Sequence, residues 1–205
     1  EFLGSLYYLP DEVSPTEWKP SYWASVCGRF YPKFSMELFE TVMKELENPL
    51  DHKMNRMSSG QLKKCYISFA IACGASYILM DEPTNGLDIP SKAQFRSVLM
   101  KYTGEESTIV ISTHQVRDLE NVIDPIIILD RCDVILNASV EQITSKLTFD
   151  YGSELKPEAL YCEHMPGGFV QVYANADGAE SKMNVEALFN AAHKNKETIK
   201  ALFEK

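Results

Sequence analysis

Hydrophobic residues along this chain form continuous runs that alternate with segments of helical character. Three runs are mostly apolar, as expected of strands that are buried in a sheet, and they span residues 3–9, 77–81 and 108–112. Helices are predicted between these runs, over residues 36–47, 60–73 and 89–102. Strands that alternate with helices in this order are typical of an α/β fold with a parallel sheet.

Shorter elements follow toward the C-terminus. A short helix over residues 115–121 is expected first, followed by a hairpin over 126–136 and a helix that opens with the capping box Ser139-Val140-Glu141-Gln142. Beyond about residue 150, strands are predicted over 159–162 and 169–173, and helices over 185–192 and 198–203. We expect this last part to be a small α+β extension.

Composition narrows the classes of function. The 205 residues are 45% hydrophobic, so the chain can bury a sizeable core. The formal net charge of −9 argues against nucleic acid as a partner, because nucleic-acid binding needs a basic face. The longest apolar stretch, residues 65–80, is shorter than a bilayer span and is interrupted by serine and glycine.

The five cysteines contain no Cys-x-x-Cys pair, which indicates reduced thiols rather than a disulfide framework. Cys162 and His164 are metal-ligand types two positions apart. Two ligands without further partners give little support for a metal site.

The clearest chemical feature is a pair of carboxylates, Asp81 and Glu82, at the end of the second apolar run. They are followed by Pro-Thr-Asn-Gly-Leu and then by Asp88. A strand that carries acids at its carboxyl end can hold a hydrated metal ion and polarise a water molecule, as nucleotide hydrolysis requires. A polar strand end at the surface would explain the acidic pair alone, but it explains the whole segment poorly.

Two further segments flank this one. Upstream, Ser58-Ser59-Gly60-Gln61 precedes a predicted helix, where a hydroxyl and backbone N–H groups can attract a phosphate. An ordinary Ser-Gly helix cap is the better explanation for this peptide taken alone. Downstream, Ser112-Thr113-His114 follows the third apolar run, and a lone histidine in such a place is usually structural.

In this order, the three segments resemble the signature motif, the Walker B strand with its D-loop, and the switch histidine of an ATP-binding subunit of an ABC transporter. The resemblance covers about residues 3–147. It implies that Asp81 binds Mg2+ through water, that Glu82 orients or activates the attacking water, and that His114 contacts the γ-phosphate of ATP. The remaining residues that it implies in nucleotide binding, across a pair of such subunits, are Ser58, Ser59, Gly60, Gln61 and Asp88.

The Q-loop of the family falls on Tyr8-Leu9-Pro10-Asp11-Glu12, where Asp11 stands in place of the glutamine. The resemblance implies that Asp11 contributes to nucleotide binding and can ligate Mg2+ or its water. A polar turn after a strand remains the alternative. The aromatic residues that follow lie where the family docks its membrane subunit, although the core of a helical subdomain explains them equally well; they are Trp18, Tyr22, Trp23, Tyr31 and Phe34.

The phosphate-binding loop Gly-x-x-x-x-Gly-Lys-[Ser/Thr] of the family is not found, since the chain contains no Gly-Lys pair. In the family this loop lies N-terminal to all the segments above. We therefore expect a fragment without its nucleotide-cradling N-terminus, inactive by itself.

The resemblance implies a fold with a P-loop NTPase-like parallel sheet whose N-terminal part is missing. We expect a partial ABC ATPase domain over residues 1–150, with an α-helical subdomain over about 13–74. The small C-terminal α+β extension would cover residues 151–205.

The implied function is ATP binding and Mg2+-dependent hydrolysis in a subunit that pairs with a second ATP-binding subunit and powers a separate integral-membrane permease. The acidic Q-loop, the short spacing between motifs and the C-terminal extension favour export. The expected location is cytoplasmic, at the inner face of the membrane through the permease. Two alternatives remain: a non-transport ABC ATPase of translation or DNA repair, and a non-catalytic module that lends Ser58 and Gly60 to a competent partner.

Overall fold

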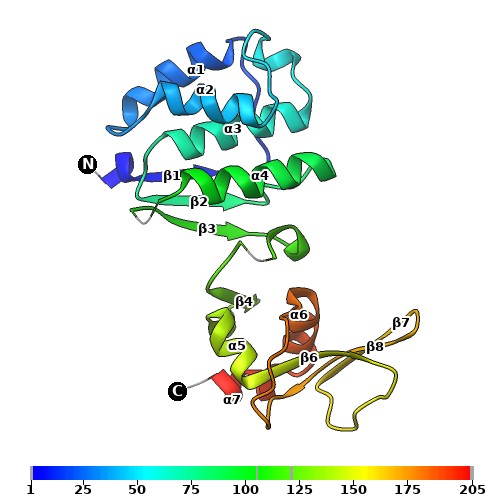
Figure 1. Cartoon of the computed structure of the whole chain (residues 1–205). Helices are drawn as coiled ribbons and strands as arrows, with labels where there is room; N and C mark the ends of the chain where they lie inside the picture. The colour runs from blue at the N-terminus through cyan, green and yellow to red at the C-terminus, as the bar shows by residue number, and fades with distance from the viewer. Residues whose placement is uncertain (1, 105, 121, 204–205) are drawn as a thin grey trace. The chain divides into compact units, whose positions relative to one another are not determined.

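The structure is a computed structural model that describes residues 2–104, 106–120 and 122–203 (Figure 1). Contacts divide the chain into two compact units, Glu1–Asp118 and Leu119–Lys205. Each unit has its own sheet and its own buried hydrophobic residues.

The first unit is built on a three-stranded parallel sheet. Its strands, in the order in which they pair, are β1 (Leu6–Leu9), β2 (Tyr77–Asp81) and β3 (Thr108–Ser112). Leu9 pairs with Met80, and Met80 with Ile111, so the three strands end at the same edge of the sheet. The residues that directly follow the strands therefore lie near one another at this edge.

Four helices accompany this sheet: α1 (Pro20–Cys27), α2 (Met36–Glu45), α3 (Ser59–Ala72) and α4 (Ile89–Tyr102). Figure 1 shows α3 and α4 beside the sheet, with α1 and α2 farther from it. Helix α2 begins where the Ser35 hydroxyl accepts a hydrogen bond from the Leu38 N–H at 3.1 Å. Short 3₁₀ turns complete the unit at Phe2–Ser5, Gly28–Phe30 and Met54–Arg56.

Phe69 of α3 lies at the centre of an aromatic cluster. Its ring centroid lies 4.9 Å from that of Trp23, 5.4 Å from those of Tyr7 and Phe34, and 5.7 Å from that of Tyr31. Aromatic pairs at such distances add packing energy beyond the area that they bury. Trp23, Tyr31 and Phe34 thus belong to this cluster.

Two aromatic residues of the same segment lie at the surface instead. Trp18 and Tyr22 are 44% and 57% exposed, and their rings meet edge to face at 5.2 Å. The core explanation thus applies to Trp23, Tyr31 and Phe34, and docking of a membrane subunit stays a prediction for Trp18 and Tyr22.

The second unit contains a hairpin, an antiparallel sheet and three helices. Its elements are β4 (Ile126–Asp130), β5 (Asp133–Ala138), α5 (Val140–Lys146), β6 (Leu147–Gly152), β7 (Tyr161–Met165), β8 (Gly168–Ala174), α6 (Val185–Lys194) and α7 (Lys196–Phe203). Strands β6 and β7 pair on either side of β8. The capping box predicted at α5 is confirmed, because the Ser139 hydroxyl and the Gln142 side chain accept each other's backbone N–H.

A buried amide holds the loop of this sheet in place. Gln171 of β8 is fully buried, its side-chain NH2 donates to the Glu154 carbonyl at 2.7 Å, and its side-chain oxygen accepts from the Lys156 N–H at 2.9 Å. Lys196 joins α7 to β4 through the Asp130 carboxylate at 2.7 Å. This hydrogen bond lowers the pKa of Asp130.

Several predicted elements are wrong in detail. The first strand begins at Leu6 rather than at residue 3, and α1 lies in a segment for which no helix was predicted. The predicted helix over 115–121 is a 3₁₀ turn, Val116–Leu119, and Asn121 lies outside the described residues. Strand β6 was not predicted, because it follows α5 directly and no turn residue separates the two elements.

Strand β3 departs from prediction in its burial. Its apolar composition predicts a strand covered on both faces, but Val110 is 51% exposed. In the described part of the chain β3 is an edge strand, paired only with β2. The expected domain boundary at residue 150 falls inside β6, and it stays a prediction beside the division into units at residue 118.

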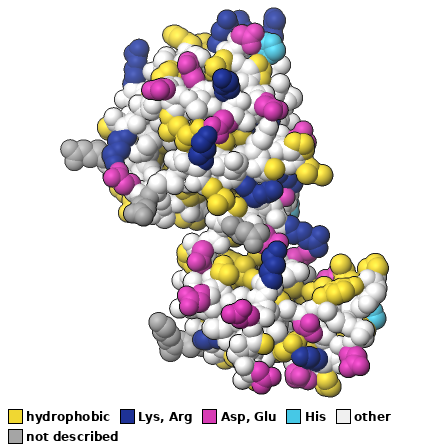
Figure 2. All heavy atoms as spheres, in the orientation of Figure 1, with side chains coloured by type: hydrophobic (Ala, Val, Ile, Leu, Met, Phe, Trp, Pro, Cys, Tyr) yellow, Lys and Arg dark blue, Asp and Glu magenta, His cyan; other side chains and the backbone are white. Residues whose placement is uncertain are grey.

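Charged side chains of both signs lie on each unit. Figure 2 shows acidic and basic side chains interspersed on the visible face of both units. None of the helices in the described residues combines the length and the hydropathy needed to cross a membrane.

Candidate functional site

The carboxyl ends of the three parallel strands carry the predicted chemical residues. Asp11 follows β1, Asp81 and Glu82 end and follow β2, and His114 follows β3. The strand register alone therefore brings these residues, which are far apart in the sequence, to one edge of the first unit.

Asp81 is held by two hydroxyl groups. The Ser112 hydroxyl donates to Asp81 Oδ1 at 2.6 Å, and the Tyr8 hydroxyl lies 3.4 Å from Oδ2. Ser112 is the register partner of Asp81 on β3, so this contact follows from the sheet. The remaining oxygen lone pairs of Asp81 are available to a cation.

Glu82 is the most constrained of the acidic residues. Its φ of +44° lies in the left-handed region, and its N–H donates to the Ser112 carbonyl at 2.9 Å. One carboxylate oxygen, Oε1, accepts the backbone N–H of His114 at 2.8 Å and lies 2.7 Å from His114 Nδ1. The other, Oε2, accepts the Thr113 hydroxyl at 2.8 Å.

These contacts fix the direction of the Glu82 carboxylate. Its side chain is only 16% exposed, whereas the His114 side chain is 74% exposed. An oriented carboxylate beside an accessible imidazole is an arrangement that can position a water molecule for attack. Thr113 was not predicted as a site residue, although it directly precedes the predicted histidine.

The predicted signature residues open helix α3. Ser58 is the N-cap: its hydroxyl accepts the Gln61 N–H at 3.2 Å, and Gln61 Oε1 accepts the Ser58 N–H at 3.0 Å. The Ser58 hydroxyl still has its own proton to donate. The N–H groups of the first helical turn, including those of Ser59 and Gly60, have no acceptor within the helix and suit an anion.

Gly60 allows the predicted signature and D-loop segments to approach each other closely. A Cβ at Gly60 would lie 3.2 Å from the carbonyl oxygen of Gly86, so the absence of a side chain permits the close approach. Asp88, two residues on, caps α4 by accepting the Ser91 N–H at 2.9 Å. Hydrogen bonds from Ser91, chiefly that of its side chain, lower the pKa of Asp88.

Asp11 has partners that the sequence did not predict. Asn85 donates its side-chain amide to Asp11 Oδ1 at 3.1 Å, and Lys63 Nζ lies 3.5 Å from the same oxygen. Lys63 is 4% exposed, which is unusual for a lysine. The only signal in the sequence was the lysine pair Lys63-Lys64 within an otherwise largely apolar helix.

The donor set fits Mg2+ bound together with a nucleotide. Mg2+ is usually held by one or two carboxylates, waters and substrate phosphates rather than by a cage of protein ligands. Within the described residues, no group of three or more His, Cys, Asp or Glu side chains could hold a metal ion. Asp81 therefore suits a water-mediated Mg2+ contact, and the metal-binding roles of Asp81 and Asp11 stay predictions.

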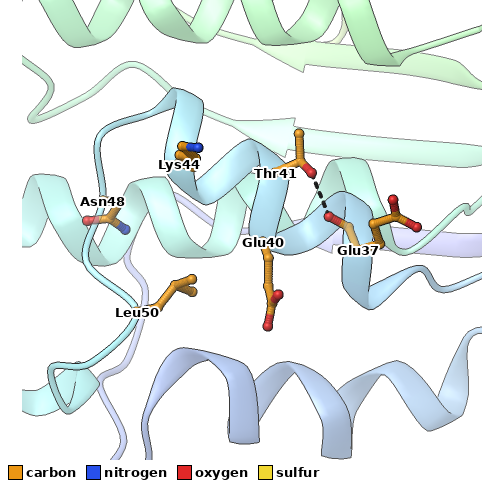
Figure 3. A pocket seen from close by; sticks show the side chains of 6 residues that line it. All are labelled: Glu37, Glu40, Thr41, Lys44, Asn48 and Leu50. Carbon is orange, nitrogen blue, oxygen red and sulfur yellow. Dashed lines mark hydrogen bonds between the residues drawn. The ribbon is translucent and has the colours of Figure 1, made fainter.

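A hollow lies elsewhere in the first unit, beside α2 and the segment that follows it (Figure 3). Its volume is about 630 Å³, and it is lined by Glu37, Glu40, Thr41, Lys44, Asn48 and Leu50. The side-chain amide of Asn48 connects it to α3 by donating to the Gln61 carbonyl at 2.8 Å. None of the predicted site residues lines this hollow.

Comparison with curated proteins finds ATP-binding proteins of transport systems among the relatives of this chain. No protein-family profile matches the chain. An uncharacterized ABC transporter ATP-binding protein of Methanocaldococcus jannaschii is 27% identical over 115 residues, which are 54% of this chain and 44% of that protein. A manganese transport system ATP-binding protein of Synechocystis is 31% identical over 48% of this chain and 39% of its own length. A macrolide export ATP-binding/permease protein of Pasteurella multocida is 35% identical over 47% of this chain and 15% of its own length.

Solved structures share the fold at lower identity. The ATP-binding subunit of an ABC transporter aligns with a TM-score of 0.60 and 20% identity, over 68% of this chain and 61% of that one. A bacterial Atm1-family ABC exporter with ATP bound aligns with a TM-score of 0.56 and 18% identity, over 68% of this chain and 26% of its own. The mixed α/β fold with a parallel sheet is thus that of ABC-type nucleotide-binding domains.

The relatives include an ATP-binding protein of a manganese transport system and a macrolide export protein. They share an ATP-binding function, but their names do not indicate one common direction of transport. The chain spans less than half the length of each of these curated relatives. By sequence and by fold, the relatives of this chain are the ATP-binding proteins of ABC transporters, of which it matches a part.

Proposed function

We propose that this chain belongs to an ATPase subunit that binds and hydrolyses ATP with Mg2+ and powers a separate membrane permease. The observation that carries the proposal is the Glu82 carboxylate, oriented by Thr113 and by the exposed His114 at the end of a parallel sheet. Such a carboxylate suits a general base that orients or activates the attacking water.

The other site residues take roles around this base. Asp81 binds Mg2+ through water, Asp11 contributes a further oxygen, and His114 contacts the terminal phosphate. The residues proposed to contact ATP across a dimer are Ser58, Ser59, Gly60, Gln61 and Asp88. Their support is the capped start of α3 and its close contact with the D-loop.

The partners follow from this arrangement. The subunit pairs with a second ATP-binding subunit, and it lies in the cytoplasm at the membrane through its permease, with no nucleic acid involved. Trp18 and Tyr22, an exposed aromatic pair beside α1, are the surface that we propose for the permease. Export is the proposed direction, supported by the acidic residue at position 11.

ATP turnover by the native polypeptide that contains this sequence tests the proposal. Wild-type protein should hydrolyse ATP, and Glu82→Gln should lower kcat by about 10²- to 10⁴-fold, because the amide cannot accept the proton of the attacking water. The chain by itself should show no turnover, since it contains no Gly-Lys pair to hold the phosphates.

Glu180→Gln, in an exposed loop of the second unit, is the matched control and should leave kcat unchanged. A native polypeptide that binds ATP with wild-type Glu82 but does not turn it over would contradict the proposal. That result would favour the non-catalytic module that lends Ser58 and Gly60 to a partner.

A further inference from the structure

Lys63 is a buried cation beside the site that has no role in the proposed chemistry. Its side chain is 5% exposed. It extends from α3, one turn after the signature residues, to the carboxyl edge of the sheet. Burying an ammonium group away from water costs several kcal/mol unless the group finds oxygen partners.

The partners of Lys63 belong to two turns that follow neighbouring strands. After β1, its Nζ donates to the Asp11 carbonyl at 2.5 Å, and lies 3.4 Å from the Pro10 carbonyl and 3.5 Å from Asp11 Oδ1. After β2, it lies 3.4 Å from the carbonyl oxygen of Glu82. One ammonium group thus joins three polypeptide segments.

The contact with Glu82 is made at a strained point of the backbone. Glu82 has a φ of +44°, a conformation that a residue with a side chain adopts only when its surroundings hold it there. The Glu82 N–H is held by Ser112 of β3, and its carbonyl faces Lys63 of α3. The peptide units on both sides of this residue are therefore fixed by different elements.

We propose that Lys63 is a positioning residue, which ties the start of α3 to the turns that carry Asp11 and Glu82 so that the signature and the base keep one geometry. This inference rests on the proposed ATPase function. Lys63 acts through Glu82, and its contacts are made to the protein. Its loss should therefore lower kcat and leave the KM for ATP nearly unchanged.

The test measures kcat, KM and the unfolding midpoint of the native polypeptide for Lys63→Met and Lys63→Arg. Lys63→Met keeps the length of the side chain and removes the charge, and it should lower kcat about tenfold with KM within about twofold. Lys63→Arg keeps the charge and the donors and should restore most of kcat. A positioning role predicts a lower kcat with nearly constant KM. A purely stabilising role would instead shift the unfolding midpoint and leave both kinetic constants unchanged.

Lys64→Met is the matched control. Lys64 is the next residue of α3, and its ammonium donates to the Leu46 carbonyl at 2.8 Å and to the Gln94 side-chain oxygen at 3.3 Å, which belong to neither turn. Its removal should change kcat by less than about twofold.

A double-mutant cycle with Asp11→Asn tests the contact of Lys63 with the Asp11 carboxylate. If Lys63 and Asp11 act as a unit, the double variant should lose no more activity than Lys63→Met. An active wild type whose kcat is unchanged by Lys63→Met, or falls equally with Lys64→Met, would overturn this inference and leave the proposed function standing. An inactive wild type would overturn both.

Discussion

Single residues at the carboxyl edge combine several contacts each. Glu82 has a left-handed backbone, and its carboxylate has three hydrogen-bonding groups around it, one from Thr113 and two from His114. A left-handed conformation at a residue with a Cβ costs about 1–2 kcal/mol, which the surrounding hydrogen bonds offset. The residue that we propose as the base is therefore also a residue whose backbone is under strain.

The acids and the histidine of this site could be predicted from the sequence, because their positions at strand ends follow from the apolar runs. The contacts of Thr113 and Lys63 could not be predicted. The first depends on the register between β2 and β3, and the second on how α3 lies across the sheet edge. Such contacts are set by tertiary packing.

Thr84, next to this site, gives a prediction on stability. It is fully buried, and its hydroxyl has no hydrogen-bond partner among the described residues. Thr84→Val removes this hydroxyl at nearly constant volume, and it should raise the free energy of unfolding by about 1 kcal/mol. Thr84→Ser, which keeps the hydroxyl and deletes the methyl group, should lower it. Denaturant unfolding at neutral pH measures both, and a loss of stability in Thr84→Val would show that the hydroxyl has a partner.

Among the elements, those whose ends have local hydrogen-bonding signals were predicted best. Ser139 caps its helix as predicted, and Ser35 and Asp88 cap α2 and α4 directly before the predicted helices 36–47 and 89–102. Helix α1 has only 8 residues, and no side-chain hydrogen bond from its N-cap marks its start. Its position is set mainly by packing, since Trp23 lies against Tyr66 and Phe69.

The end of helix α3 depends on Gly74. This residue has a φ of +66°, and a Cβ there would lie 2.6 Å from the Lys33 Cβ and 2.8 Å from the Lys33 carbonyl oxygen. Gly74→Ala combines backbone strain with a steric clash, and it should lower the free energy of unfolding by about 2–4 kcal/mol.

Gly86→Ala provides the control for this substitution. Gly86 has a φ of +77°, but a Cβ there would meet nothing within 4 Å. Gly86→Ala should therefore lower the free energy of unfolding only by the backbone strain, about 1–2 kcal/mol. Equal losses in the two variants, measured by denaturant unfolding, would show that the segment around Lys33 moves aside.

For the molecule as a whole, the two units make a prediction about fragments. Strand β6 pairs with β8 along Leu147–Gly152, so a cut at residue 150 divides a strand of the second unit. A fragment of residues 119–205 should show a cooperative unfolding transition by circular dichroism, whereas 151–205 should not. Cooperative folding of 151–205 would instead support the boundary expected from the family resemblance.

The turn between β4 and β5 has a practical consequence. Cys132 in this turn is the exposed thiol among the five cysteines, whereas Cys65 and Cys73 are buried and Cys27 and Cys162 are partly buried. Burial raises the pKa of Cys65 to about 12 and that of Cys73 to about 11, so neither supplies thiolate at neutral pH. A brief reaction with a maleimide dye should therefore place a single fluorophore on the second unit without any engineered cysteine. The natural sequence thereby contains its own attachment point for spectroscopy.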